Sequence, residues 1–176
     1  ERRAAECVAS GLHRMHVSID GASASTYEHI RVRSRFERVV RNVRRLVAAR
    51  AQAGSSTPEI RLVAVAMRTN LHELAQLVHL AHELGTPHLS VQHLCHDYGE
   101  TSLPERYRPM RAFVDAETLL QADPREVEAC FEAARAAARE LGVMLRLPNI
   151  RPKPFDPHVD GRSRCDWPWR GAYLSY

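Results

Sequence analysis

Ser18 and Asp20 place a hydroxyl and a carboxylate where a predicted strand ends, and such groups can bind a ligand or transfer a proton. Apolar and polar residues alternate with a period of two over 15–20, which predicts the strand. In α/β folds, ligand chemistry gathers at the carboxyl ends of strands. The alternative is an ordinary strand exit whose polar residues are only solvated.

Two further predicted strands, 60–67 and 88–94, also end in polar residues, at 68–70 and at 92–96. The first is nearly continuous in apolar and β-branched residues, which indicates a parallel strand covered on both faces. Parallel strands bring their carboxyl ends to one edge of a sheet, so the three polar ends predict one site there.

Helices must separate these strands. Capping boxes at 25–28 and 34–37 predict two helix starts, and Asn70 and Asp123 predict two more. The helix from Asp123 ends before Gly142 and leads to a fourth strand over 143–147, whereas 95–122 is irregular with one short helix. The alternation predicts an α/β fold, as a partial (β/α) barrel or part of an open sheet of parallel strands.

The formal charge of +4 comes from arginine, and eight arginines lie between Arg31 and Arg50. They form either a nucleic-acid patch or the solvated face of a helix. The one aromatic residue in this range, Phe36, belongs to the apolar stripe of the predicted helix and is not available for base stacking, so we expect no nucleic-acid partner. No signal peptide and no membrane-spanning apolar run is present, so we expect a cytoplasmic protein without a membrane partner.

The four cysteines lie far apart and form neither a disulfide framework nor a complete metal motif. Cys130 falls on the apolar side of the last predicted helix and is expected in the core. His72, His79 and His82 share one predicted helix, where they either hold a metal ion or are solvated.

Five segments, in order, resemble the second half of a radical S-adenosylmethionine enzyme with a SPASM-type auxiliary iron–sulfur domain. They are VSIDG (17–21), YEHIR (27–31), VAMRTN (65–70), VQHL (91–94) and CDWPWRGAYLS (165–175). The resemblance implies a partial radical S-adenosylmethionine barrel over 1–147, a linker over 148–164, and the start of a truncated, Cys-rich SPASM-like domain over 165–176. The chain opens on glutamate rather than methionine, so we expect a fragment.

The implied chemistry is reductive cleavage of S-adenosylmethionine at a 4Fe–4S cluster, giving a 5′-deoxyadenosyl radical that abstracts hydrogen from a peptide or small-molecule substrate. A reductant such as flavodoxin or ferredoxin is the other implied partner. The C-x-x-x-C-x-x-C cluster loop precedes this stretch in the family order, so this chain alone is expected to be inactive.

By this resemblance, Ser18 contacts the ribose or methionyl group of the cofactor, and Asp20 orients the same site or faces the substrate. Arg31 matches the arginine that pairs with the methionyl carboxylate through its bidentate fork. Asn70 either contacts the cofactor or only caps a helix. Gln92 ends the strand whose backbone lies along adenine.

Cys165 is expected to be the first ligand of an auxiliary cluster; the alternative is a packed cysteine beside two tryptophans. The family often has glycine after the arginine that Arg31 matches, whereas this chain has Val32 and Arg33. Two other functions stay open: a (β/α) barrel lyase or isomerase that uses Asp20 and a histidine, and an arginine-rich module that binds acidic partners.

Overall fold

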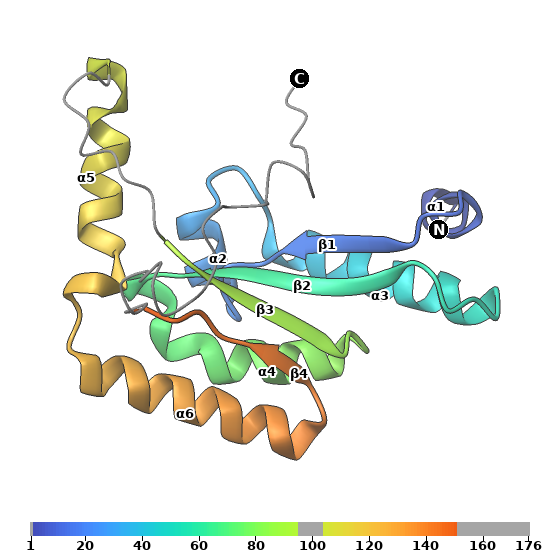
Figure 1. Ribbon diagram of the computed structural model, residues 1–176. Coiled ribbons are helices and arrows are strands. Elements are labelled where there is room, and N and C mark those ends of the chain that lie inside the picture. Colours follow the sequence, from blue (N-terminus) through green and yellow to red (C-terminus); the bar gives the residue numbers. More distant parts are fainter. Residues whose placement is uncertain (1, 95–103, 151–176) are drawn as a thin grey trace, which may run out of the picture.

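The computed structural model describes residues 2–94 and 104–150, and it contains one four-stranded parallel sheet (Figure 1). The strand order β1-β2-β3-β4 follows the chain, and parallel pairing of neighbours requires a crossover between each pair. The α/β class with parallel strands is therefore confirmed. The strands are β1 (Arg14–Ser18), β2 (Glu59–Ala66), β3 (His88–His93) and β4 (Met144–Arg146).

Six α-helices and three short 3-10 helices belong to the described residues. Figure 1 shows α4 and α6 along the same side of the sheet, α1 beside α3, and α5 standing away from the body at the carboxyl ends of the strands. The helices are α1 (Arg2–Ala9), α2 (Ala24–Ile30), α3 (Phe36–Gln52), η1 (Arg68–Glu73), α4 (Leu74–Glu83), η2 (Glu105–Tyr107), α5 (Arg108–Glu117), η3 (Leu119–Gln121) and α6 (Pro124–Leu141).

The core lies on the helix-covered face of the sheet. Residues of β2 alternate between buried and half-buried along the whole strand. Ile60 and Leu62 are fully buried against the helices, whereas Arg61 and Val63 are half-buried on the other face. The sequence predicted a strand covered on both faces, and the structure covers one face fully and leaves the other half-buried. The open face is free to carry polar groups.

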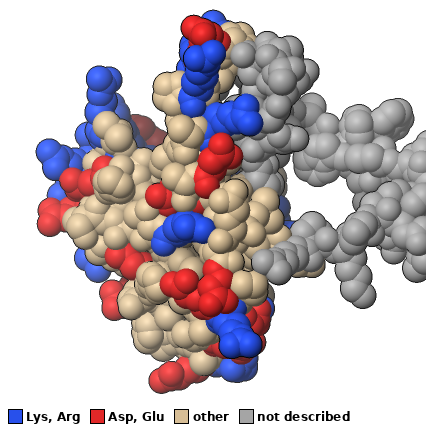
Figure 2. All heavy atoms as spheres, turned by 90° about the vertical axis from the view of Figure 1, so that its left-hand side faces the viewer, with Lys and Arg blue, Asp and Glu red and all other residues tan. Residues whose placement is uncertain are grey.

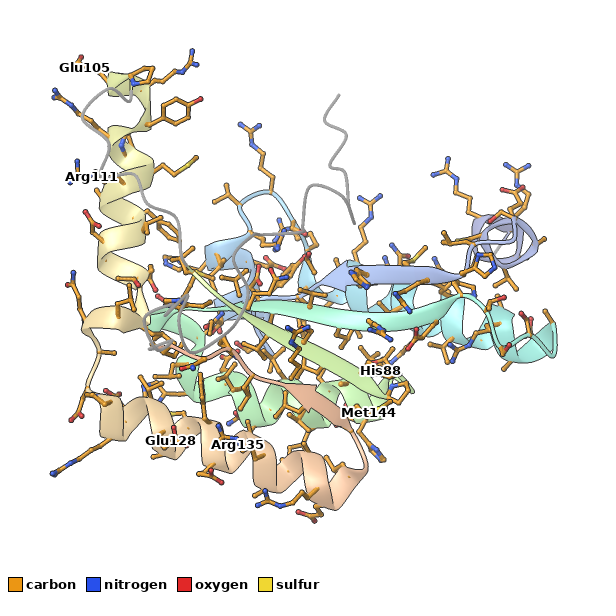
Figure 3. The ribbon with its side chains drawn as sticks, in the orientation of Figure 1. His88, Glu105, Arg111, Glu128, Arg135 and Met144 are labelled. Carbon is orange, nitrogen blue, oxygen red and sulfur yellow. The ribbon has the colours of Figure 1, made fainter. Side chains whose placement is uncertain are left out.

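Polar side chains gather on this open face near the amino ends of the strands. Glu59 accepts hydrogen bonds from Arg14 Nε at 3.0 Å and from Arg61 Nη2 at 2.8 Å. His88 Nε2 lies 2.8 Å from the same carboxylate, and His88 and Met144 are labelled at this end in Figure 3. The hydrogen bonds from Arg61 and Arg14 lower the pKa of Glu59 from 4.5 to about 2.

Replacement of Glu59 by glutamine is expected to make the free energy of unfolding less dependent on pH in the acidic range. Since the folded pKa lies below the ordinary one, the carboxylate stabilises the fold above about pH 4.5, and this contribution is lost as the pH falls through about 2. Urea titrations from pH 7 to pH 2.5 should show that the variant has a lower free energy of unfolding than the wild type, and that this deficit shrinks towards low pH. Glu140→Gln, on the exposed side of α6, is the control, and a deficit that is constant with pH would contradict the prediction.

Both predicted capping boxes are wrong. Ser23, not Ser25, caps α2, since its Oγ accepts from Thr26 N at 3.2 Å. Glu28 instead reaches the start of α3, where its Oε1 accepts from Phe36 N at 3.2 Å. The turn before α2 leaves no room for a side chain, because a Cβ at Gly21 would lie 2.7 Å from Tyr27 N, and this tight turn starts the helix early.

The last helix follows the sequence prediction. The Oδ1 of Asp123 accepts from Arg125 N at 2.9 Å, and Gly142 ends α6 in the left-handed conformation. The segment predicted as irregular with one short helix contains η2, the ten-residue α5 and η3. No helix in the described part of the chain is both long and apolar enough to cross a bilayer. The predicted linker beyond residue 150 and the predicted domain 165–176 lie outside the described residues.

Candidate functional site

The candidate site lies where β1, β2 and β3 end, at one edge of the parallel sheet. Asp20 follows β1 by two residues, η1 follows β2, and β3 ends at His93. Tyr27 anchors α2, which leads the chain from the end of β1 back to Arg31: it is buried and accepts the Arg31 N–H at its carbonyl, 2.8 Å away. Residues from three separate segments therefore meet at the edge that the sequence predicted.

A buried carboxylate holds an arginine at this edge. The side chain of Asp20 is 4% exposed, and its Oδ2 accepts from Arg31 Nε at 2.6 Å. Its other oxygen accepts from Val65 N at 2.8 Å, so the carboxylate is also tied to β2. The Arg31 side chain is 38% exposed, and its two Nη groups donate to no described residue. Asp20 thus orients the guanidinium and leaves its outer fork available to an anion.

Asn70 ties together the backbone beneath this pair. It is fully buried, and its Nδ2 donates to the carbonyls of Asp20 and Val65, both at 2.8 Å. Its Oδ1 accepts from Met67 N at 2.8 Å. Asn70 is the third residue of η1, and its side chain accepts from the N–H of Met67, which precedes η1. It does not stand in front of the helix, as the predicted cap would. Its contact with a cofactor stays a prediction.

Ser18 and Gln92 lie on the open face of the sheet, outside this bonded network. Ser18 pairs in register with Val63 on β2, and Gln92 pairs with Val65. The two side chains are thus on opposite sides of β2 and two residues apart in register. Both are exposed, and neither forms a hydrogen bond with another described residue. A hydroxyl and an amide are therefore available on the open face, close to the carboxyl ends of β1 and β3.

Glu73 is a residue of this edge whose role sequence reasoning missed. It accepts hydrogen bonds from Ala22 N at 2.7 Å, Ser23 N at 3.2 Å, Ser23 Oγ at 2.7 Å and Thr26 Oγ1 at 2.6 Å. Burial raises its pKa, but the hydrogen bonds from Thr26 and Ser23 outweigh burial, and the pKa is lowered. Glu73 thereby fixes the turn between β1 and α2 to the start of α4. No local pattern signals a contact between residues about fifty positions apart.

His93 is the second residue of interest that the sequence did not single out by itself. It closes β3 opposite Ala66, and its Nε2 is buried without a hydrogen-bond partner among the described residues. Burial lowers the pKa of the imidazole, which favours the neutral ring. Ala66 and Val91 are buried in the core, so His93 belongs to the helix-covered side, whereas Ser18 and Gln92 belong to the open side.

Arg33 occupies the loop position at which the sequence departs from the family pattern. Its φ is 68°, in the left-handed region that favours glycine. The chain therefore adopts with an arginine the backbone conformation that a glycine would adopt without strain.

The cysteine and the histidines weighed as alternatives lie on the helical side. Cys130 is half-buried rather than inside the core, and its Sγ is 3.7 Å from His72 Nδ1. Burial and the charge of Glu126 raise the pKa of this thiol, which disfavours a nucleophilic thiolate. His79 and His82 are exposed. Within residues 2–94 and 104–150, no group of three or more metal-binding side chains is arranged to hold an ion, and Cys165 lies outside these ranges.

The edge thus offers one anchored guanidinium with a free fork, one free hydroxyl and one free amide. Figure 2 faces the carboxyl ends of the strands and shows acidic and basic side chains interspersed on the described part of this face. A carboxylate that meets the fork would therefore be bound by local contacts rather than by a broad basic field. No protein-family model and no curated protein matches the chain.

Proposed function

We propose that the chain contributes part of the S-adenosylmethionine site of a radical S-adenosylmethionine enzyme whose full-length form carries a SPASM-type auxiliary domain. The observation that carries the proposal is the Arg31 guanidinium, which Asp20 holds by Nε while both Nη groups remain unbonded among the described residues. A planar fork held in this way matches a carboxylate in a bidentate manner. The resemblance of the five sequence segments to the family supports the methionyl group of the cofactor as that carboxylate.

The described residues fit a zwitterionic nucleoside ligand of this kind. Arg31 would bind the carboxylate, the Ser18 hydroxyl would accept from or donate to the ribose or methionyl group, and the Gln92 strand would lie along the base. Asp20 and Asn70 would keep the fork in position. When bound with a 4Fe–4S cluster, the cofactor supplies radical chemistry directed at a peptide or small-molecule substrate. Cys165 stays the predicted first ligand of an auxiliary cluster.

The test measures cofactor affinity by calorimetry on the reconstituted full-length enzyme. Arg31→Ala is expected to weaken binding by about ten- to a hundredfold, since it removes a charge-assisted bidentate contact. Arg31→Lys keeps the charge and neutralises Asp20 but loses the fork, so a loss of about tenfold is expected for it.

Arg33→Ala is the matched control, because Arg33 lies in the same loop and makes no contact with Asp20. It should bind the cofactor within about twofold of the wild type. Unchanged affinity of a folded Arg31→Lys or Arg31→Ala variant would remove Arg31 from the site and end the proposal in this form.

An acid–base enzyme on a (β/α) scaffold is the second candidate, and the observation that favours it is the buried, unpartnered Nε2 of His93. Its lowered pKa suits a general base at neutral pH. The two candidates differ in one inexpensive respect. The radical enzyme requires three closely spaced cysteines in the coding sequence before residue 1, and the acid–base enzyme does not.

A further inference from the structure

An arginine-lined groove between α1 and α3 lies away from the candidate site. It has a volume of about 540 Å³ and begins beside Met15, near the amino end of β1, whereas the candidate site lies at the carboxyl ends of the strands. Figure 1 shows α1 and α3 at the end of the sheet opposite α5. The arginines that line the groove are Arg2, Arg3, Arg38, Arg41 and Arg45.

The charges in this groove are almost entirely unpaired. Arg2 forms an exposed ion pair with Glu6 at 3.5 Å, and the other four arginines form no ion pair with any described residue. Among the described residues, no acidic side chain lines the groove. Five guanidinium groups around one depression repel one another, and an anionic partner would relieve that repulsion.

The arginines of α3 form a ladder. Arg38, Arg41 and Arg45 follow the i, i+3, i+7 spacing, so they share one face of the helix. They are separated along the axis by about 4.5 and 6 Å. Acidic residues at positions i, i+3 and i+7 of a partner helix would have the same spacing. Such a helix packed along α3 would present one carboxylate to each of the three arginines.

The floor of the groove is apolar, and this decides between anionic partners. Part of it comes from Met15 and Leu46, which belong to or pack against the core. A nucleic-acid backbone would leave this floor without contacts, and none of the described residues that line the groove is aromatic and able to stack on a base. An amphipathic helix would place apolar side chains on the floor and carboxylates against the arginines. The remaining floor residues are Ala4 and Cys7.

We propose that this groove binds an acidic amphipathic helix of a protein partner. The inference does not depend on the proposed cofactor site, since the two regions share no residue. Interfaces of this kind bury a small apolar centre and use the surrounding charges for orientation and for the rate of association.

The test uses an 18-residue fluorescein-labelled peptide with leucines on one helical face and glutamates on both flanks. Its binding to the full chain is followed by fluorescence anisotropy at two salt concentrations. Arg41→Glu combined with Arg45→Glu should weaken binding at least tenfold, and the corresponding double glutamine variant should weaken it several-fold. The control is Arg125→Glu with Arg139→Glu, two exposed arginines of α6, which should bind within twofold of the wild type.

Cys7, a half-buried free cysteine that lines the groove, tests separately whether the peptide binds in the groove. The peptide should slow alkylation of Cys7 several-fold, measured by mass spectrometry, and should leave Cys130 on α6 unchanged. The proposal is overturned if the double glutamate variant binds as tightly as the wild type, or if Cys7 is not protected. It is also overturned if a scrambled peptide binds equally well, or if an 18-base-pair DNA duplex binds more tightly than the peptide.

Discussion

Replacing Asn70 by alanine is expected to lower the free energy of unfolding by roughly 2–4 kcal/mol. The substitution leaves three backbone groups without their partners: the buried carbonyl of Asp20, the buried N–H of Met67 and the part-buried carbonyl of Val65. Each buried, unsatisfied group costs about 1–3 kcal/mol, partly relieved where water can enter. Urea titrations followed by circular dichroism measure the difference.

Asn42→Ala is the matched control, because Asn42 is exposed on α3, and it should change stability by no more than about 0.5 kcal/mol. A loss below about 1 kcal/mol for Asn70→Ala would show that the amide does not brace the strand ends. The variant also tests the candidate site indirectly. If Asn70 positions Asp20 as proposed, Asn70→Ala should also weaken binding of the proposed cofactor to the full-length protein, although the substitution leaves the Arg31 side chain unchanged.

Removal of the Glu73 carboxylate is expected to cost about 2–3 kcal/mol of folding stability. Glu73→Ala deprives the N–H groups of Ala22 and Ser23 and the hydroxyls of Ser23 and Thr26 of their common acceptor. Charge-assisted hydrogen bonds are worth about 1.5–3 kcal/mol each, and partial exposure reduces their sum. Glu83→Ala is the control, because Glu83 is exposed at the end of α4, the helix that Glu73 precedes.

The loss should depend on pH with a defined sign. The hydrogen bonds keep the folded pKa of Glu73 below its ordinary value of 4.5 despite burial. The carboxylate therefore stabilises the fold above that ordinary pKa, and its contribution disappears as acid protonates it. The gap between wild type and Glu73→Ala should be full at pH 7 and should narrow below pH 4.5. A gap that widens in acid would contradict the assignment.

The sheet and most helices were predictable because their signals are local and repeated. Alternation over 15–20 places β1 to within two residues, and the apolar run over 60–67 places β2 to within one residue. Asp123 and Gly142 predict both ends of α6, since cap and stop lie next to the helix they terminate. The spacing of serine and glutamate gave a wrong prediction for α2. Glu28 has the spacing of a capping box, yet it accepts a hydrogen bond from the first residue of α3, the following helix.

The site was predictable only residue by residue. Asp20 and Arg31 were both singled out, but their bond to each other depends on how α2 brings the chain back to the strand end. Glu73 carried no signal, because its four donors lie some fifty positions earlier. Cys130 was predicted in the core from its helical position, and it is only half-buried, since His72 of η1 borders it at the surface.

The outer strand β1 has a practical consequence for handling the protein. β1 has a single strand neighbour among the described residues, so its other edge has backbone donors and acceptors that no described strand pairs. Such an edge is a template on which a second chain can add a strand. The strand is only five residues long and carries exposed Arg14 and His16, features that slow this kind of growth. The short length and these two polar side chains therefore limit the edge-to-edge association of concentrated samples that the open edge of β1 would otherwise favour.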